Sequence, residues 1–405
     1  MAEITFPELR PPLDASAAVL EADRCLDCSG PYAAAPCTAA CPAGVDVPRF
    51  VRELAAADSS SAAATIYRDN LLGGTCARVC PVEVLCEAAC VLRHERGHPI
   101  SIAALQRFAT DEARRAGLPL RGRAPARSDR VVVVVGAGPA GLSCAGELAA
   151  RGLHAVVLDD HDEVGGIVRT AIAPYRQGVD PLPAEREALA ALGVEFRLGT
   201  RVGCVDDVLA WSPAAVFLAP GLGGDRELEC PGTELAGYWR SLDFIAALKE
   251  GRPPEVGSHV VVLGGGNTAI DVAREAVRLG ARATVAYRRT RDRMPAYRFE
   301  VDEAAAEGVR FEWRVTPVAI LGAGRVEAIV LRRDEEELAV SADTVVAAIG
   351  QVPRPELDAW RAALEEAGVP VFAGGDAVNG GASVVQAVAD GKAAAREIEE
   401  ATCRS

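Results

Sequence analysis

This chain has almost no lysine, no excess of basic charge and few aromatic residues. Only Lys249 and Lys392 occur among its 43 basic residues, whereas alanine, arginine and glycine are abundant, a composition typical of GC-rich codon usage rather than of a particular function. The net charge is −14 over 405 residues, which argues against nucleic-acid binding as a main role. Half of the residues are hydrophobic, so the chain is not disordered and has room for two or three domains.

Segments that would direct the chain into or across a membrane are also missing. The apolar run Val131–Val135 is far shorter than the roughly twenty residues that span a bilayer. Residues 1–20 have no apolar core after a basic start, so we expect no secretory signal peptide. Clustered cysteines without a targeting sequence then indicate a cytoplasmic protein with reduced thiols.

Eight of the twelve cysteines lie in one block near the start of the chain, between Cys25 and Cys90. A C-x3-C-P step occurs twice, ending at Cys41-Pro42 and at Cys80-Pro81, and resembles the tail of the bacterial ferredoxin ligand run. Two [4Fe–4S] centres, each with four soft ligands, account well for this block. The block consists of Cys25, Cys28, Cys37, Cys41, Cys76, Cys80, Cys86 and Cys90.

Zinc and disulfides are the alternatives for this block. The step Cys25-x2-Cys28 is common in zinc sites, whereas disulfides would require an oxidising compartment. The two C-P steps and the nucleotide motifs downstream favour iron–sulfur centres. We interpret the scattered cysteines as buried structural thiols; these are Cys144, Cys204, Cys230 and Cys403.

The rest of the chain predicts an α/β fold with two nucleotide-binding units after a helical N-terminal domain. Short helices are expected among the cysteines, followed by a Pro- and Arg-rich linker at Leu118–Arg130. Two β-α-β units follow, each with a glycine turn between strand and helix. The expected segments are helices at Pro48–Ala57, Ala62–Asp69, Ile102–Arg115, Leu142–Arg151 and Ala269–Leu279, and strands at Val131–Val135, Ala155–Leu158, Val260–Leu263 and Ala283–Tyr287.

The first glycine turn has the G-x-G-x-x-G pattern that binds a dinucleotide. Glycines at its three key positions allow the tight turn, the close approach of a pyrophosphate, and the packing of helix on strand. Asp159 ends the next strand, where an acid binds ribose hydroxyls. The turn comprises Gly136, Gly138, Pro139, Ala140 and Gly141.

Two later features favour FAD at this first site. Gly165 and Gly166 form a glycine pair of the kind that lies against flavin, with Arg169 close behind. The motif Phe372–Asp376, with Gly375 and Asp376, is similar to the one whose acid binds the ribityl chain. A helix starting near Ser383 and Val384 could direct its positive end at the flavin ring.

The second glycine turn predicts an NADPH site. It follows the same strand–turn–helix plan, but the acid after the next strand is replaced by Arg288 and Arg289. Arginine binds a 2′-phosphate that an acid would repel, although these arginines could also belong to a solvated surface run. The expected nucleotide contacts are Gly264, Gly266, Asn267, Thr268 and Ala269, together with Gly350.

In this order, these motifs resemble the NADPH:FAD iron–sulfur oxidoreductase family. That family includes the glutamate synthase small subunit, the N-terminal part and separate small subunit of dihydropyrimidine dehydrogenase, and the large subunit of ferredoxin:NADP transhydrogenase. The stretches that carry the resemblance include TCARVCPVEVLCEAACVL, GGGNTAIDVARE and AGGDAVNGGASVVQAVADGKAAA. This sequence departs from the family's usual motifs at three places that are expected near the flavin: Ala219-Pro220-Gly221, Asp159 and residues 170–176.

The resemblance implies a ligand set in which one site is glutamine. It assigns one cluster to Cys25, Cys28, Cys37 and Cys90, and the other to Cys41, Cys80, Cys86 and Gln106. Cys76 would then be a non-ligand, although eight cysteines alone would suggest a site made only of cysteines.

The expected function is electron input from NADPH through FAD and two [4Fe–4S] clusters to a partner subunit. The only C-x-x-C pair, Cys25 and Cys28, lies in the metal block, so thiol exchange beside the flavin is not expected. The partner could be a pyrimidine-reducing flavoprotein or a glutamate synthase large subunit. The alternatives are a zinc-stapled flavin reductase acting on a small substrate and a subunit of a bifurcating transhydrogenase. The expected division is 1–128 for clusters, 129–255 and 341–405 for FAD, and 256–340 for NADPH.

Overall fold

The computed structural model describes residues 6, 8–30, 33–119, 121–122, 125–178 and 180–403, which form two compact units. The larger unit joins Leu9–Arg169, Val179–Leu222 and Pro353–Ser405. The smaller unit joins Met1–Glu8, Thr170–Gly178 and Gly223–Val352. The chain therefore enters each unit more than once, and the four-part division expected from the sequence remains a prediction.

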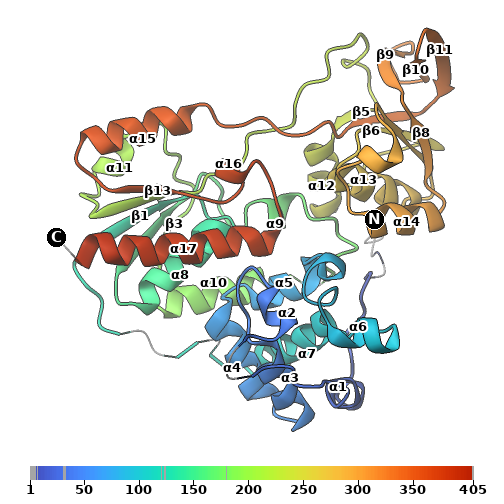
Figure 1. Ribbon diagram of the computed structural model, residues 1–405. Helices are drawn as coiled ribbons and strands as arrows, with labels where there is room; N and C mark the ends of the chain where they lie inside the picture. Colours follow the sequence, from blue (N-terminus) through green and yellow to red (C-terminus); the bar gives the residue numbers. More distant parts are fainter. Residues whose placement is uncertain are drawn as a thin grey trace. The chain divides into compact units, whose positions relative to one another are not determined.

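The larger unit begins with short helices that surround the cysteine block (Figure 1). Aspartate side chains start three of them: Asp14, Asp46 and Asp58 each accept a hydrogen bond from the backbone N–H three residues later. The elements are α1 (Ala15–Ala22), α2 (Pro36–Ala39), α3 (Val47–Ala55), α4 (Ser59–Asp69), α5 (Gly73–Val79), a 3-10 turn (Val82–Val84), α6 (Val91–Arg96) and α7 (Ile102–Arg115).

A parallel five-stranded sheet follows in the same unit, in the order β13-β4-β1-β2-β3. Its strands are β1 (Val131–Val135), β2 (His154–Leu158), β3 (Glu195–Arg197), β4 (Ala215–Leu218) and β13 (Val371–Ala373). The accompanying helices are α8 (Pro139–Ala150), α9 (Ile167–Thr170), α10 (Leu182–Ala191), α11 (Asp206–Leu209), α15 (Glu356–Glu366), α16 (Asp376–Asn379) and α17 (Val384–Cys403).

Alternation along β1 divides the core of this unit between the two faces of the sheet. Val132 and Val134 pack in one apolar cluster with α8, α17 and the N-terminal helices. Val133 and Val135 pack in another with Val208 of α11 and Leu364 of α15. Successive side chains of a strand point to opposite faces, so an all-valine strand can be buried on both. The helices α8 and α17 run side by side along one face (Figure 1).

The smaller unit holds a second parallel sheet, in the order β5-β12-β6-β7-β8, and a three-stranded antiparallel sheet, β11-β10-β9. Its strands are β5 (Tyr238–Arg240), β6 (His259–Leu263), β7 (Arg282–Tyr287), β8 (Arg310–Trp313), β9 (Thr316–Leu321), β10 (Ala328–Arg333), β11 (Glu336–Ser341) and β12 (Thr344–Ala347). Its helices are α12 (Ser241–Lys249), α13 (Asn267–Arg278) and α14 (Arg298–Ala306), with a 3-10 turn at Arg291–Arg293.

The predicted α/β class and both β-α-β units are confirmed. The strand Val131–Val135 and the helix Ile102–Arg115 have the expected bounds, and the other predicted segments differ by one to three residues at their ends. The helices α8 and α13 start earlier than predicted because each glycine turn passes directly into the first helical turn. The helix α13, for example, begins at Asn267 rather than at Ala269.

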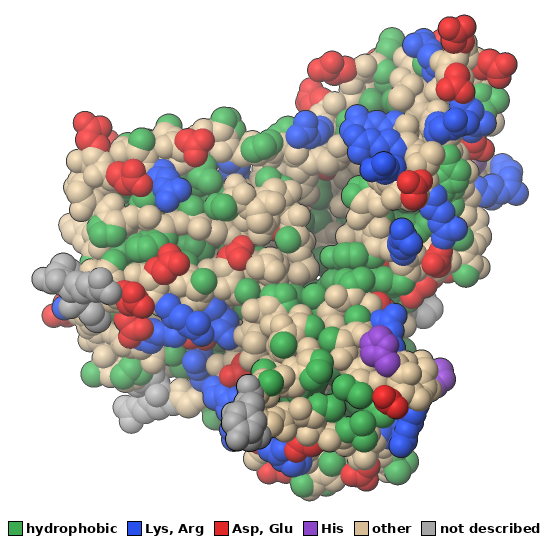
Figure 2. All heavy atoms as spheres, viewed as in Figure 1, with side chains coloured by type: hydrophobic (Ala, Val, Ile, Leu, Met, Phe, Trp, Pro, Cys, Tyr) green, Lys and Arg blue, Asp and Glu red, His purple; other side chains and the backbone are tan. Residues whose placement is uncertain are grey.

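Charged side chains of both signs are interspersed on the face shown in Figure 2. Oppositely charged side chains form ion pairs within one element, such as Arg49 with Glu53 in α3, or between neighbouring strands, such as Arg332 of β10 with Glu337 of β11. None of the described helices combines the length and apolarity needed to cross a bilayer.

Candidate functional site

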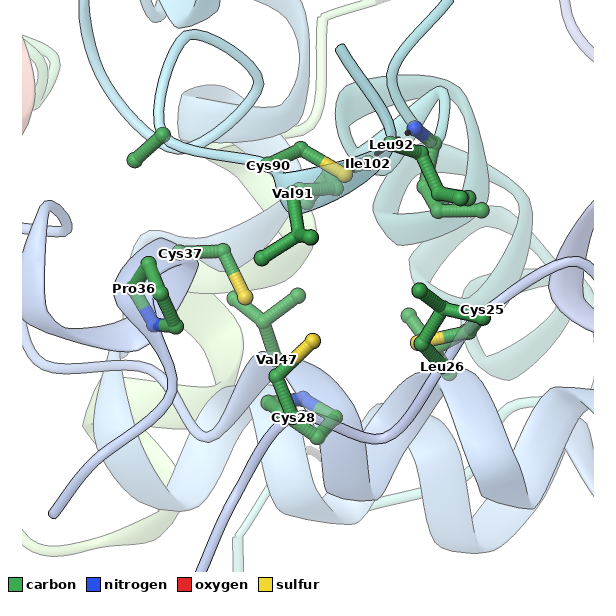
Figure 3. Close-up of a pocket in the computed structure, with 14 residues that line it drawn as sticks. Cys25, Leu26, Cys28, Pro36, Cys37, Val47, Cys90, Val91, Leu92 and Ile102 are labelled. Atoms are coloured by element: carbon green, nitrogen blue, oxygen red, sulfur yellow. Dashed lines mark hydrogen bonds between the residues drawn. The ribbon is translucent and has the colours of Figure 1, made fainter. Parts of the chain in front are cut away.

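The first cysteine cavity brings together all four residues assigned to one cluster. Cys25, Cys28, Cys37 and Cys90 line it, and Figure 3 shows their sulfur atoms arranged around a common space. They come from three places in the chain: the loop after α1, helix α2, and the N-cap of α6. The rest of the wall is apolar and includes Leu26, Val51, Leu92 and Ile100.

One of the four cysteine sulfur atoms accepts a hydrogen bond from the backbone. The backbone N–H of Ile100 lies 3.4 Å from Cys90 Sγ and donates to it. Such N–H···S bonds stabilise charge on a cluster sulfur and are one of the levers on its potential. The Cys28 side chain is exposed, so one side of this cavity faces solvent.

The second cavity contains the other predicted ligand set and also Cys76. Its lining includes Cys41, Cys80, Cys86 and Gln106. The Gln106 amide nitrogen donates to the Gly73 carbonyl at 2.7 Å, which leaves its Oε1 as the free ligand atom. The structure thus places both candidates for the eighth ligand, Gln106 and Cys76, at one site.

The two cavities share a wall. Val47 and Ile102 line both of them. Burial raises the pKa of Cys37 to about 11 and also raises those of Cys41 and Cys86, whereas the pKa of Cys80 is raised first by its hydrogen bond with Cys76 and then by burial. Thiolates here would need a nearby cation. Iron supplies that charge, so a soft, sulfur-rich donor set in an apolar wall fits an iron–sulfur centre.

The first glycine turn is closed by the end of strand β4. Gly136 has a φ of +106°, and a Cβ there would lie 2.2 Å from the Ala219 carbonyl oxygen. A Cβ on Gly141 would lie 1.9 Å from the Gly136 oxygen. Around a Cβ on Gly138, the N-cap of α8, there is open space. The open side at a helix N-terminus is where a pyrophosphate would fit.

The predicted ribose and flavin residues of the larger unit gather around this turn. The Asp159 carboxylate accepts a hydrogen bond of 2.6 Å from the Ala137 N–H within the turn. Gly165 donates its N–H to the Ala137 oxygen, and a Cβ on Gly166 would lie 3.0 Å from the Gly138 Cα. Pro139 and Ala140 form the first turn of α8.

The C-terminal flavin motif reaches the same turn. A Cβ on Gly375 would lie 2.9 Å from the Ala140 Cβ. The Asp376 carboxylate accepts from the Ala382 N–H, and burial raises the pKa of Asp376. Ser383 directly precedes α17, which begins at Val384 as expected. Arg169, by contrast, is half-exposed and forms an ion pair with Glu163.

The second glycine turn repeats this construction in the smaller unit. Gly264 has a φ of +136°, and a Cβ there would lie 2.0 Å from the Ala348 oxygen at the end of β12. A Cβ on Gly266, the N-cap of α13, would meet open space. Asn267 accepts the Tyr297 N–H, while Thr268 and Ala269 continue the first turn.

The two predicted phosphate arginines are exposed. Arg288 and Arg289 follow β7 directly, on the loop after its last residue, Tyr287. Gly350 is also exposed, and the Arg226 side chain lies 3.8 Å from where its Cβ would be. Arg226 was not predicted, because 124 residues of sequence separate it from Gly350.

Burial of the scattered cysteines differs from the expectation. Cys144 is fully buried and Cys230 half-buried, but Cys204 is exposed, so its interpretation as a buried thiol is wrong. Cys204 lies on a loop before α11 whose N–H groups donate to Asp207. The side chain of Cys403 lies outside the described residues.

Sequence and structure comparisons agree with this architecture. Residues 2–118 match the family described as dihydropyrimidine dehydrogenase domain II, 4Fe-4S cluster, and residues 129–391 match the pyridine nucleotide-disulphide oxidoreductase family. The chain is 33% identical to the glutamate synthase [NADPH] small chain of Escherichia coli, over 97% of this chain and 93% of that one. It is also 33% identical to the E. coli NAD-dependent dihydropyrimidine dehydrogenase subunit PreT, over 96% of both.

Among solved structures, thioredoxin reductase of Lactococcus lactis superposes with a TM-score of 0.53 at 21% identity, over 68% of this chain and all of that one. This likeness concerns the fold alone. The family resemblance predicted from the sequence is confirmed by these matches, as is the prediction of an oxidoreductase. The chain therefore belongs to the pyridine nucleotide-disulphide oxidoreductase family, as an electron-transfer oxidoreductase that carries a 4Fe-4S domain at its N-terminus.

Proposed function

We propose that this chain is the electron-input subunit of a larger oxidoreductase, taking electrons from NADPH and passing them to a partner protein. The observation that carries the proposal is the pair of adjacent cysteine-lined cavities with Val47 and Ile102 as a common wall. When bound, FAD and two [4Fe–4S] centres would supply hydride acceptance and single-electron transfer. Reduced thiols are needed for such centres, so we place the protein in the cytoplasm.

The chain's own residues have separate tasks in this proposal. Gly138 and the first turn of α8 hold the FAD pyrophosphate, with Asp159 at its ribose. Gly266 and Asn267 hold the nicotinamide nucleotide. Four cysteines hold the first centre, and the second is held by three cysteines with Gln106; these three are Cys41, Cys80 and Cys86.

The second cavity lies beside the helix proposed to face the flavin, which supports a path from flavin to cluster. Val385, in the first turn of α17, is part of the lining of that cavity. The exposed Cys28 in the first cavity supports an exit there, because a partner could approach that centre closely. A glutamate synthase-like or dihydropyrimidine dehydrogenase-like acceptor subunit fits this arrangement.

A visible spectrum of anaerobically purified protein, with metal analysis, tests the proposal. We expect flavin bands over a broad iron–sulfur background, bleaching by NADPH, and about eight iron atoms per chain, as two cubane centres require. Flavin with zinc and without iron would instead support a zinc-stapled flavin reductase acting on a small substrate. Iron without flavin would refute the role of the first glycine turn.

The choice of nucleotide has its own test. We expect the double variant Arg288→Ala/Arg289→Ala to raise the KM for NADPH about ten- to a hundredfold, because the charge-assisted hydrogen bonds lost at these exposed side chains are worth about 1.5–3 kcal/mol together. The KM for NADH should stay within twofold. Arg293→Ala is the matched control, since this arginine is also exposed on the same loop. Equal losses with both nucleotides would contradict 2′-phosphate binding.

A further inference from the structure

One of the two lysines of the chain, Lys392 in the long helix α17, bonds to backbone carbonyls near the second cysteine cavity. The Lys392 ammonium donates to the Ala43 carbonyl at 2.6 Å and to the Asp69 carbonyl. Ala43 follows Cys41 by two residues, and Asp69 is the last residue of α4. Lys392 therefore attaches the loop that carries Cys41 to α17.

The same helix also packs against α8, the helix that follows the first glycine turn. Gly391, next to Lys392, packs so closely on α8 that a Cβ there would lie 2.2 Å from the Ala140 oxygen. Val385 of α17 lines the second cavity. A displacement of α17 would thus change the surroundings of the flavin turn and of the second cavity together.

The lysine is notable because the chain otherwise uses arginine almost throughout. Lys249 and Lys392 are the only lysines among 43 basic residues. Both are half-buried and donate to backbone carbonyls: Lys249 to Ile172 and Lys392 to Ala43 and Asp69. The three N–H donors of an ammonium allow Lys392 to bond two carbonyls at once.

The charge of Lys392 is near the second cavity and only partly screened by solvent. Burial lowers the pKa of Lys392, while the carboxylates of Glu147 and Asp69 and the thiol of Cys41 oppose that change. Glu147 is itself paired with Arg121 and Arg151. A fixed positive charge beside a partly buried centre favours the state that holds one more electron.

Resting on the function proposed above, we propose that Lys392 is a positioning residue for electron transfer. It holds the Cys41 loop on α17, and its charge raises the reduction potential of the centre in the second cavity. Electrons arriving from the flavin side would then be drawn first to that centre.

A redox titration of the holoenzyme, followed by electron paramagnetic resonance, tests this proposal. In Lys392→Met we expect the potential of one of the two centres to fall. At a fixed solution potential its reduced-to-oxidised ratio should drop at least tenfold, which corresponds to about 59 mV for one electron. Lys392→Arg should recover most of the potential because it restores the charge.

The matched control is Arg396→Met, which removes a positive charge one turn along the same helix. Arg396 is exposed, so the ratio should change less than twofold. Loss of one centre in Lys392→Met, with flavin and the other centre kept and with recovery in Lys392→Arg, would also support the positioning role. Both centres present at unchanged potentials in Lys392→Met would overturn it. Wild-type protein without iron–sulfur signals would instead refute the proposed function itself.

Discussion

Glu185 accepts three hydrogen bonds from the first turn of α5, and two of them come from Thr75, 110 residues earlier in the chain. The donors are the Gly74 N–H at 2.9 Å, the Thr75 N–H at 3.0 Å and the Thr75 hydroxyl at 2.5 Å. The helix α10 of Glu185 thereby fixes α5, which carries Cys76 and ends at Cys80. One wall of the second cavity is thus set by a carboxyl group from a distant helix.

The pH dependence of stability should reveal this buried carboxyl. Burial raises the pKa of Glu185 to about 7, against the ordinary value of 4.5. Tyr67 and Arg78 are the titratable groups that face it from α4 and α5. The unfolded chain releases this proton at lower pH than the folded protein, so the folded state loses stability as pH rises from 4.5 to 7. The loss is about 3 kcal/mol at 1.36 kcal/mol per pKa unit.

Thermal unfolding of Glu185→Gln and wild type at pH 5 and pH 7.5 measures this effect. The variant should gain stability relative to wild type at the higher pH, because it has no proton to lose. Glu187→Gln is the control, since Glu187 is an exposed residue of the same helix. Parallel pH profiles for Glu185→Gln and wild type would contradict the prediction.

Substitution of the two candidates for the eighth ligand should distinguish them. We expect Cys76→Ala to keep the full iron content, since Cys76 would be a wall residue. Gln106→Ala should lose iron from one centre or change its resonance spectrum, because the Oε1 left free by the Gly73 bond is removed. Iron lost in Cys76→Ala and kept in Gln106→Ala would assign the site to cysteine.

An alanine at Gly264 should abolish nucleotide binding without loss of flavin. The added Cβ would lie 2.0 Å from the Ala348 oxygen, so the turn must shift. Gly280→Ala is the matched control, because Gly280 also has a positive φ, +89°, but open space around a Cβ. Flavin content and the NADPH dependence of flavin bleaching are the measurements. If NADPH reduces the flavin of Gly264→Ala as it does in wild type, the turn accommodates the added Cβ and the prediction is wrong.

Removal of the buried acid Glu275 should stabilise the protein. Glu275 on α13 is fully buried, and neither of its carboxyl oxygens has a hydrogen-bond partner among the described residues. Burial raises its pKa well above 4.5, with Asp271 adding to the rise. Glu275→Met removes an unsatisfied polar group, which costs about 1–3 kcal/mol, so the unfolding temperature should increase.

The contrasting variant is Glu307→Met, at the C-cap of α14 in the same unit. Burial alone would raise the pKa of Glu307, but hydrogen bonds from Arg278 and Arg274 lower it to about 2. Its removal leaves Arg274, which is fully buried, without two of its hydrogen bonds, so we expect destabilisation. Equal changes in the unfolding temperature of Glu275→Met and Glu307→Met would contradict the view that Glu275 is unpaired and destabilising while Glu307 stabilises Arg274.

The elements that were predicted well are those defined by local chemistry. The glycine spacing at Gly136 and Gly264 and the all-valine strand at Val131–Val135 depend on the conformations of neighbouring residues, so they can be recognised in the chain. The predicted starts of α8 and α13 were less accurate, because the first turn of each helix is continuous with a glycine turn. The prediction that Cys204 is buried was wrong, because the exposure of a loop residue depends on which segments pack against the loop.

The sequence alone determined the fold class, the two nucleotide turns and the cysteine block, because each of these depends on short spacings and side-chain type. It could not show that Lys392 meets Ala43 across 349 residues, or that Glu185 meets Thr75. Only the tertiary structure decided these pairs, and it placed in two cavities the two ligand sets that the family resemblance implied. Contacts between distant segments depend on how helices pack, and no local pattern in the chain records that packing.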